Sequence, residues 1–309
     1  MVRDWFYSHP TWLNGSTIVF SAVFLSLVFL TCFHKLVPWE TRRVHNDVAG
    51  FIIAIVGVIY AVLLAFIAVF TWENFNKAQD TAELEANMVA NLYVDSAGLP
   101  PKIAFAVRRN LRDYSRLVIN KEWPAQQAGH VNTEAWKPLF KLNLAIARFR
   151  PAESAGPIEA EILHTANQLY EARRDRLVAA ASGIPNVMWA VTLLGGALTV
   201  GFSFLFGVPN FRLHLIMTGI LSASLSLVIV LIVALDCPFR GQLSVSSDIY
   251  QRIFQSVVPA MTIDLANVRS VEPDYREMTD STLTDTIYSK YFSDLPRGSF
   301  DRMLVSEPP

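Results

Sequence analysis

Side chains that could act as catalysts or metal ligands are few in this 309-residue chain, and they follow no known catalytic spacing. The motifs HExxH, GxSxG, Walker A and GxGxxG are all absent. The six histidines are scattered at His9, His34, His45, His130, His164 and His214. Two cysteines, Cys32 and Cys237, are too few for a disulfide framework or a CxxC metal site. The sequence therefore predicts no enzyme, no catalytic residue, no metal and no cofactor.

Three arginines offer a different chemistry, the electrostatic attraction of anions. Arg108, Arg112 and Arg116 recur every four residues and so share one face of a predicted helix. They could line a vestibule that attracts anions. The plainer alternative, which the pattern favours, is a solvated face or salt bridges to acids such as Glu83 and Glu85. A net charge of −1 without long runs of like charge gives no indication of a nucleic-acid partner.

The apolar block Val48–Trp72 carries a stripe of small side chains along one helix face. The stripe consists of Gly50, Ala54, Gly57, Ala61, Ala65 and Ala68. Small residues let helices approach closely in lipid, so helix packing is the default interpretation. The functional interpretation is that identical copies of this helix surround an axis and line a narrow pore. Its apolar constrictions, which would gate by dewetting, are then formed by Phe51, Ile55, Val58 and Val62.

Two predicted helix ends carry local signals. His45-Asn46-Asp47-Val48 is typical of an N-cap, which would aim free backbone N–H groups at incoming anions. After the last apolar block comes Leu235-Asp236-Cys237-Pro238-Phe239-Arg240-Gly241. The Asp-x-Pro pattern is typical of a helix end, and the glycine indicates a turn. We therefore single out Asp236, Pro238, Phe239 and Gly241 as a post-helix turn.

The elements that must position these residues are membrane helices, because four long blocks contain no charged residue. The chain is 52% hydrophobic and 17% charged, whereas soluble domains are nearer a quarter charged. The blocks are Trp5–His34, Val48–Trp72, Leu177–Phe211 and Leu213–Leu235. A helix needs about 20 apolar residues to cross the hydrocarbon core. With a turn at Gly207-Val208-Pro209-Asn210, we predict four spans, about 16–33, 48–72, 184–206 and 212–235.

The charged remainder predicts a helical water-soluble part. No glycine or proline occurs from Val58 to Ala97, so the second span should continue into this part. An apolar stripe predicts a helix from Ile103 that closes at Glu122-Trp123-Pro124 and a Gln/Gly loop. Further helices are expected at Thr133–Arg148, Ile158–Ala181 and Ser246–Val258. The predicted domains are 1–72 (tail and first two spans), 73–183 (cytoplasmic helical domain), 184–235 (last two spans) and 236–309 (cytoplasmic helix and tail).

Basic residues near the spans favour an orientation with both termini and the long loop in the cytoplasm, seven against four. Three of them, Arg173, Arg174 and Arg176, precede the third span and are interpreted as anchors to anionic lipid. The expected location is a plasma (inner) membrane, with the chain crossing it several times.

Several of these motifs resemble the bestrophin-like domain family of bacteria and plants. They are His45-Asn46-Asp47 with Gly50-Phe51, Gly57-x-x-Tyr60-Ala61-Val62-Leu63-Leu64-Ala65-Phe66, Arg112-x-Tyr114, Glu122-Trp123-Pro124, Arg173-Arg174-x-Arg176-Leu177 and Leu235-Asp236-x-Pro238-Phe239-x-Gly241. The order of elements is similar to that of true bestrophins. The resemblance implies an all-α membrane protein with four transmembrane helices, cytoplasmic termini and a cytoplasmic helical bundle. It also implies a pentameric ring whose second helices line a pore that conducts chloride and other anions past an apolar neck.

Carried over to this chain, Gly50-Phe51 and Ile55 look like the neck-forming start of the second helix. Asp236-x-Pro238-Phe239-x-Gly241 is similar to the Asn-Pro-Phe-Gly stretch after the last bestrophin span. Bestrophins follow that stretch with acidic residues that clasp calcium. Here Gln242–Asp248 contains a single acid, and calcium prefers six to eight oxygen ligands, so calcium gating is not expected.

The leading hypothesis is a homo-oligomeric, anion-conducting channel in a lipid bilayer. Its pore-lining candidates are Gly50, Phe51, Ala54, Ile55, Val58, Ala61 and Val62. The alternative is a non-conducting membrane scaffold or sensor whose cytoplasmic bundle binds a partner.

Overall fold

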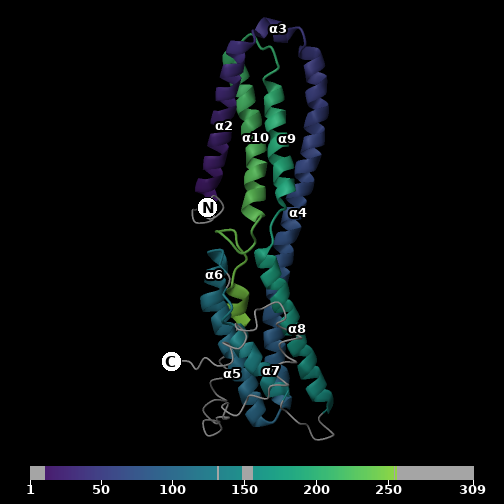
Figure 1. Cartoon of the computed structure of the whole chain (residues 1–309), viewed down its shortest axis with the longest axis vertical. Helices are drawn as coiled ribbons and strands as arrows, with labels where there is room; N and C mark the ends of the chain where they lie inside the picture. Colours follow the sequence, from purple (N-terminus) through teal and green to yellow (C-terminus); the bar gives the residue numbers. More distant parts are fainter. Residues whose placement is uncertain (1–10, 131, 148–155, 254, 256–309) are drawn as a thin grey trace. The chain divides into compact units, whose positions relative to one another are not determined.

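The computed structural model describes residues 11–130, 132–147, 156–253 and 255, and these residues form helices and turns without any strand (Figure 1). The helices are α2 (Thr11–Leu36), α3 (Trp39–Arg43), α4 (Asn46–Asp95), α5 (Pro101–Leu117), α6 (Trp123–Gln127), α7 (Trp136–Ala147), α8 (Gly156–Ala181), α9 (Asn186–Ser203) and α10 (Phe211–Leu235). A 3-10 turn, η1, covers Ser96–Gly98, and a π-helical turn, η2, covers Val118–Glu122. Residues 248–253 are also helical, and the remainder of the predicted C-terminal helix lies largely outside the described residues.

The chain divides into two compact units. Unit 1 consists of Met1–Ala78 and Ala179–Val245, and unit 2 consists of Gln79–Val178 and Ser246–Pro309. The long helices α4 and α8 each contribute residues to both units.

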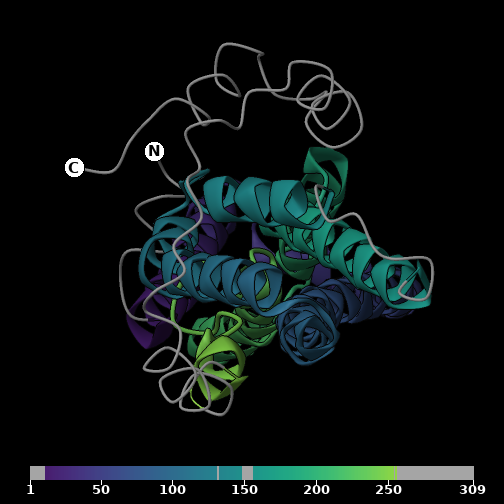
Figure 2. The same ribbon diagram turned by 90° about the horizontal axis from the view of Figure 1, so that it is seen from below.

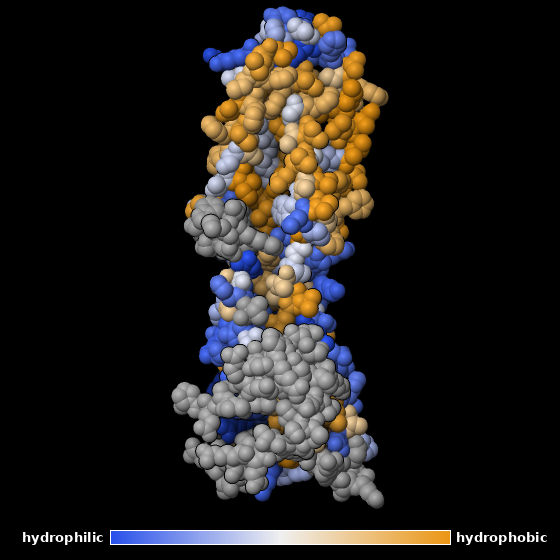
Figure 3. Space-filling view, in the orientation of Figure 1, coloured by the Kyte–Doolittle hydropathy of each residue, from blue (hydrophilic) through white to orange (hydrophobic). Residues whose placement is uncertain are grey.

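Unit 1 carries the membrane helices. The described residues include four helical stretches that are long and apolar enough to cross a bilayer, and they contain α2, α4, α9 and α10. These helices run side by side in Figure 1, and the face of them seen in Figure 3 is mostly hydrophobic. The prediction of an all-α protein with four spans is confirmed, and the chain is a multi-pass membrane protein.

Helix α4 is much longer than a bilayer requires. Its 50 residues rise about 75 Å at 1.5 Å per residue, whereas the hydrocarbon core is about 30 Å thick. The apolar stretch Val48–Trp72 belongs to unit 1, and the polar continuation from Gln79 belongs to unit 2. The helix ends at Asp95, where η1 and Pro100-Pro101 follow. The predicted continuation of the second span is therefore confirmed.

One face of α4 packs inside unit 1. Tyr60, Leu64 and Ile67 form a buried cluster with Ile184 and Ile232. The Tyr60 hydroxyl donates a hydrogen bond of 2.7 Å to the carbonyl of Thr192 on α9. A Cβ atom on Gly195 would lie only 2.5 Å from the Tyr60 ring, so glycine at this position permits the close approach of α4 and α9.

Helix α4 starts at Asn46, within the predicted N-cap motif His45-Asn46-Asp47-Val48. Asn46 does not cap the helix; its side chain pairs with the backbone of Gly207, donating to the carbonyl at 3.1 Å and accepting from the N–H at 2.8 Å. Nearby, the buried Arg42 donates to the carbonyl of Phe204 at 2.6 Å and to Nδ1 of His34 at 2.8 Å. The polar side chains at this end therefore tie α2, α3 and α4 to the connection between α9 and α10.

The turn after α10 has a role that the sequence did not reveal. The Asp236 carboxylate accepts a 2.6 Å hydrogen bond from the N–H of Ile184, just before α9. The carbonyl of Pro238 accepts from the N–H of Val245 at 2.7 Å, and the Phe239 side chain is buried. Gly241 has φ of 80°, a backbone region that favours glycine. Asp236 thus joins the end of α10 to the beginning of α9, in addition to ending its own helix.

Unit 2 is built mainly from α5, α7, the part of α4 from Gln79 onward and the part of α8 up to Val178. Helices α5 and α7 lie side by side in both views (Figures 1 and 2). The helical path passes through Glu122-Trp123-Pro124 as η2 and α6 and ends at Gln127, where the predicted Gln/Gly loop begins. The wider turn of a π-helix leaves room for the ring of Pro124, which would clash in a regular helix interior.

Replacing Gly195 by alanine should destabilise the protein, because the added methyl group collides with the hydrogen-bonded Tyr60 ring. The matched control is Gly201→Ala in the same helix, where a Cβ meets no atom within 4 Å. We expect a cost of about 1–3 kcal/mol for Gly195→Ala and none for Gly201→Ala. Thermal unfolding of the detergent-solubilised protein measures both, and equal melting temperatures would show that Tyr60 moves away without cost.

Candidate pore-lining face and a buried charge cluster

The two faces of α4 have different surroundings within the chain. Phe51, Val58 and Val62 are 71%, 65% and 50% exposed. Ile55, on the same side, is 49% exposed. These residues lie about half a helical turn away from the packed face that contains Tyr60. The four predicted constriction residues therefore share one face, which the described residues of the chain leave uncovered.

The small residues of α4 lie at the edge of this uncovered face. A Cβ atom added to Gly50 or Gly57 would meet no atom within 4 Å, and Ala54 and Ala61 are exposed. No other described helix of the same chain packs against these glycines, so packing within one chain does not account for them. The space beside them is open to another copy of the chain or to a passage.

The exposed face of α4 is apolar throughout its membrane part. No charged residue occurs from Val48 to Trp72, so a passage lined by this face would offer ions no fixed charge and few hydrogen bonds. A narrow hydrophobic constriction of this type conducts when it is wet and blocks ions when it is dry. One copy of the helix supplies only one wall, and such a passage therefore requires several copies.

The three arginines on α5 lie outside this face and have local partners. Arg108 donates from Nε to the Ser96 hydroxyl at 2.9 Å, and its guanidinium lies 4.8 Å from the centre of the Tyr93 ring. Arg112 is 3.8 Å from the Asp113 carboxylate. Arg116 is exposed. Glu83 accepts a hydrogen bond of 3.0 Å from the side chain of Gln79.

Arg173 and Arg176 are not exposed lipid anchors. Both are fully buried in unit 2, together with Glu85 of α4 and Glu122 of η2. Arg173 Nη2 donates to Glu122 at 2.9 Å, and Arg176 Nη2 donates to Glu122 at 2.7 Å. Arg176 also forms an ion pair with Glu85 through Nε. We call these four residues the charge cluster. Of the three arginines that were interpreted as lipid anchors, only Arg174 is exposed.

Neutral side chains complete the hydrogen bonding of the charge cluster. Tyr114 donates to Glu85 and accepts from Arg173 at 3.1 Å, while Arg176 donates to Gln126 at 3.0 Å. The guanidinium of Arg173 lies 4.5 Å from the ring centre of Trp136, and that of Arg176 lies 5.0 Å from that of Trp123. Burial, reinforced by the charge of Glu85, raises the pKa of Tyr114, so its hydroxyl keeps the proton that it donates.

The sequence contains a signal for the charge cluster, because its charged residues occupy positions in otherwise apolar, buried stripes of their helices. Glu85 occupies the same stripe of α4 as the buried residues Ala78, Ala82, Val89 and Leu92, with spacings of three and four residues. A charge at such a position must be buried with a partner. Arg173 and Arg176 likewise continue the buried stripe of Ile162 and Leu169 on α8. Among the described residues, no group of three or more His, Cys, Asp and Glu side chains could hold a metal ion.

Arg176→Met should destabilise unit 2 strongly, because Glu85 and Glu122 then remain buried with only one of their two arginines. Breaking a buried ion pair by removing one partner costs about 3–5 kcal/mol. Arg174→Met is the matched control, since Arg174 is exposed on the same helix turn and its loss should cost less than about 0.5 kcal/mol. Thermal unfolding in detergent compares the two, and an unchanged melting temperature for Arg176→Met would contradict a stabilising cluster.

Comparison with known proteins was consistent with this architecture. The model of the family described as Bestrophin-like domain matches residues 19–250. No curated protein matches the chain. A solved bacterial bestrophin homologue from Klebsiella pneumoniae, carrying a leucine-to-threonine mutation, aligns with a TM-score of 0.61 and 11% identity, covering 79% of this chain and 98% of that chain.

Two solved membrane proteins are similar to the same degree. One carries a glycine-to-alanine mutation and aligns with a TM-score of 0.61 and 12% identity, covering 79% of this chain and 98% of that chain. The other carries a proline-to-alanine mutation and aligns at 0.60 and 11%, covering 78% and 97%. At these identities the likeness establishes a shared fold. Since the family model covers most of the sequence, the chain belongs to the Bestrophin-like domain family.

Proposed function

We propose that the protein is a homo-oligomeric anion channel in which the exposed face of α4 from each copy lines a central pore. The observation that carries this proposal is the uncovered apolar face around Phe51, Val58 and Val62, opposite the face that packs within unit 1. The membership of the chain in the Bestrophin-like domain family supports it. The proposal takes chloride conduction and a pentameric ring from the resemblance to bestrophins. It takes the expectation that the protein is not an enzyme from the lack of catalytic motifs in the sequence.

The proposed pore has an apolar neck and no fixed charge within the membrane. Phe51 and Ile55 narrow its start, and Val58 and Val62 continue the neck one to two turns further along α4. An anion passing the neck would lose part of its hydration shell, so small changes in neck width would decide whether the neck is wet. Gly50 and Gly57 let neighbouring α4 helices approach closely in the ring.

The same helix, α4, is continuous from Asn46 to Asp95 and contributes residues to both units. The charge cluster fixes the polar part of α4 through Glu85. We therefore assign this cluster the role of holding the polar part of α4 in one rotational position within unit 2.

The proposed orientation places both termini and unit 2 in the cytoplasm of a cell whose plasma membrane holds the channel. Arg108, Arg112 and Arg116, which belong to unit 2, would then lie on the cytoplasmic side of the membrane. Arg116 is the most exposed of the three, whereas Arg108 contributes its charge while bonded to Ser96. In this position the arginines would raise the local concentration of anions.

Phe51→Ala and Ile55→Ala should increase anion flux, because both replacements widen the apolar neck. A barrier lowered by about 1 kcal/mol raises the rate roughly fivefold. Phe24→Ala on α2 is the control, since Phe24 is also apolar and 70% exposed but lies on another helix. The measurement is flux from liposomes that contain the purified protein, under chloride, nitrate and potassium gradients.

Four results would contradict parts of this proposal. Potassium-selective flux would overturn the selectivity, and flux that neither neck variant changes would overturn the position of the pore. A monomeric or dimeric mass in detergent would exclude a central pore of this kind. Absence of flux from a correctly folded oligomer, in the wild type and in both neck variants, would favour the scaffold or sensor.

A further inference from the structure

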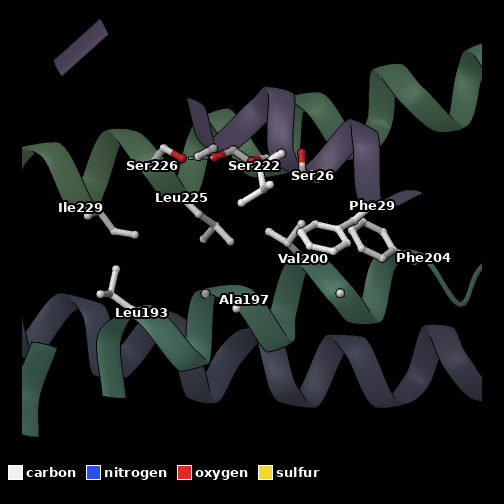
Figure 4. A pocket seen from close by; sticks show the side chains of 14 residues that line it. Ser26, Phe29, Leu193, Ala197, Val200, Phe204, Ser222, Leu225, Ser226 and Ile229 are labelled. Atoms are coloured by element: carbon white, nitrogen blue, oxygen red, sulfur yellow. Dashed lines mark hydrogen bonds between the residues drawn. The ribbon is translucent and has the colours of Figure 1, made fainter. Parts of the chain in front are cut away.

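A cavity in unit 1 lies away from the exposed face of α4. It is enclosed by α2 and α10 on one side and by α9 on the other (Figure 4). Its volume is about 340 Å³, and its large lining side chains include Phe29, Leu193, Val200, Phe204, Leu225 and Ile229. Phe29 and Leu193 are 56% and 54% exposed. The cavity therefore opens to the outside of the helices.

The polar groups of the cavity offer little to a polar ligand. Ser26, Ser222 and Ser226 are its hydroxyl side chains, and no charged residue lines it. Ser26 donates its proton to the carbonyl of Val23 at 2.8 Å, and Ser226 donates to that of Ser222 at 2.7 Å. Two of the three hydroxyl protons are thus held by the backbone of their own helices, so the ligand that fits is apolar.

The surroundings and the size of the cavity select one apolar occupant. The three helices that form it are membrane spans, so its opening faces the hydrocarbon chains of lipids. An apolar cavity of about 150 Å³ accommodates benzene, and by that scale 340 Å³ holds a chain of roughly a dozen carbons.

We propose that this cavity is a binding site for one alkyl chain of a membrane lipid. The chain restores the dispersion contacts that the facing walls of α2 and α9 would otherwise lack, and it stabilises their separation. Ala22 on α2 and Ala197 on α9 face this space as small side chains that leave room for it. The proposal is independent of conduction, because binding and stability can be measured without flux.

Photolabelling of the intact protein tests the site directly. The probe is a phosphatidylcholine with a diazirine on one acyl chain, mixed into phosphatidylcholine vesicles that contain the protein. After irradiation, mass spectrometry locates the labelled residues. We expect labelling of Phe29, Leu193 and Phe204 to exceed that of Phe24 and Leu198, which are each 70% exposed outside the cavity. The expected excess is at least about fivefold, the ratio given by a preference of about 1 kcal/mol.

Two variants that fill the cavity from opposite walls provide the second measurement. Ala197→Phe and Ala22→Phe should each abolish the excess labelling, and the rise in melting temperature on adding lipid to delipidated protein should shrink with them. Leu198→Phe, which adds the same ring outside the cavity, should change neither. Where one variant fails to fold, the other and the wild-type pattern still decide.

Labelling of the wild type in proportion to exposure would overturn the proposal. So would protection of the lining residues from the probe, since that pattern would mean that another part of an oligomer covers the cavity. Excess labelling that survives both filling variants would also contradict an alkyl chain inside it.

Discussion

The structure depends on the unequal surroundings of the two faces of α4. One face is fixed inside the chain by the hydrogen bond from Tyr60 to Thr192 and by the close approach that Gly195 allows. The opposite face around Phe51 and Val58 is left exposed by the part of the chain that the structure describes. Apolar exposure alone costs little in hydrocarbon, but this face also borders two uncrowded glycines and carries no charge. Together these features suit a wall that is shared by several copies.

The charge cluster provides the corresponding constraint in unit 2. Burying two arginines and two glutamates costs solvation free energy, which is offset only when their ion pairs and hydrogen bonds have good geometry. Here each charge has several partners from α4, α5, η2 and α8. A purely apolar contact would allow α4 to slide or rotate among similar packings. Directional hydrogen bonds to Glu85 favour one rotational position of the polar part of α4 within unit 2.

Much of the fold follows from the sequence, because the charge-free blocks and helix breakers are strong local signals. Such local signals predicted the four spans, the long continuation of α4 and the turn at Gly207-Val208-Pro209-Asn210. Contacts between residues that are far apart in the sequence were harder to predict. Asparagine is typical of an N-cap position, but the side chain of Asn46 forms hydrogen bonds with the backbone of Gly207, more than 160 residues away. Arg173 and Arg176 look like interfacial arginines until their distant acids are known. The exposed face of α4 was predictable from its residues, whereas what covers it in an assembly depends on other copies.

The central claim, that the exposed face of α4 lines a water-filled path, is tested most directly by cysteine accessibility during flux. With the exposed Cys32 replaced by alanine and the buried Cys237 left in place, one further cysteine is introduced at a time, at Val58 on the exposed face or at Leu64 on the packed face. A membrane-impermeant, negatively charged thiol reagent is then added to reconstituted protein. The account predicts that modification of Val58→Cys stops anion flux and that Leu64→Cys remains unreactive. Val58→Cys that reacts only with lipid-soluble reagents, or reacts without any change in flux, would contradict it.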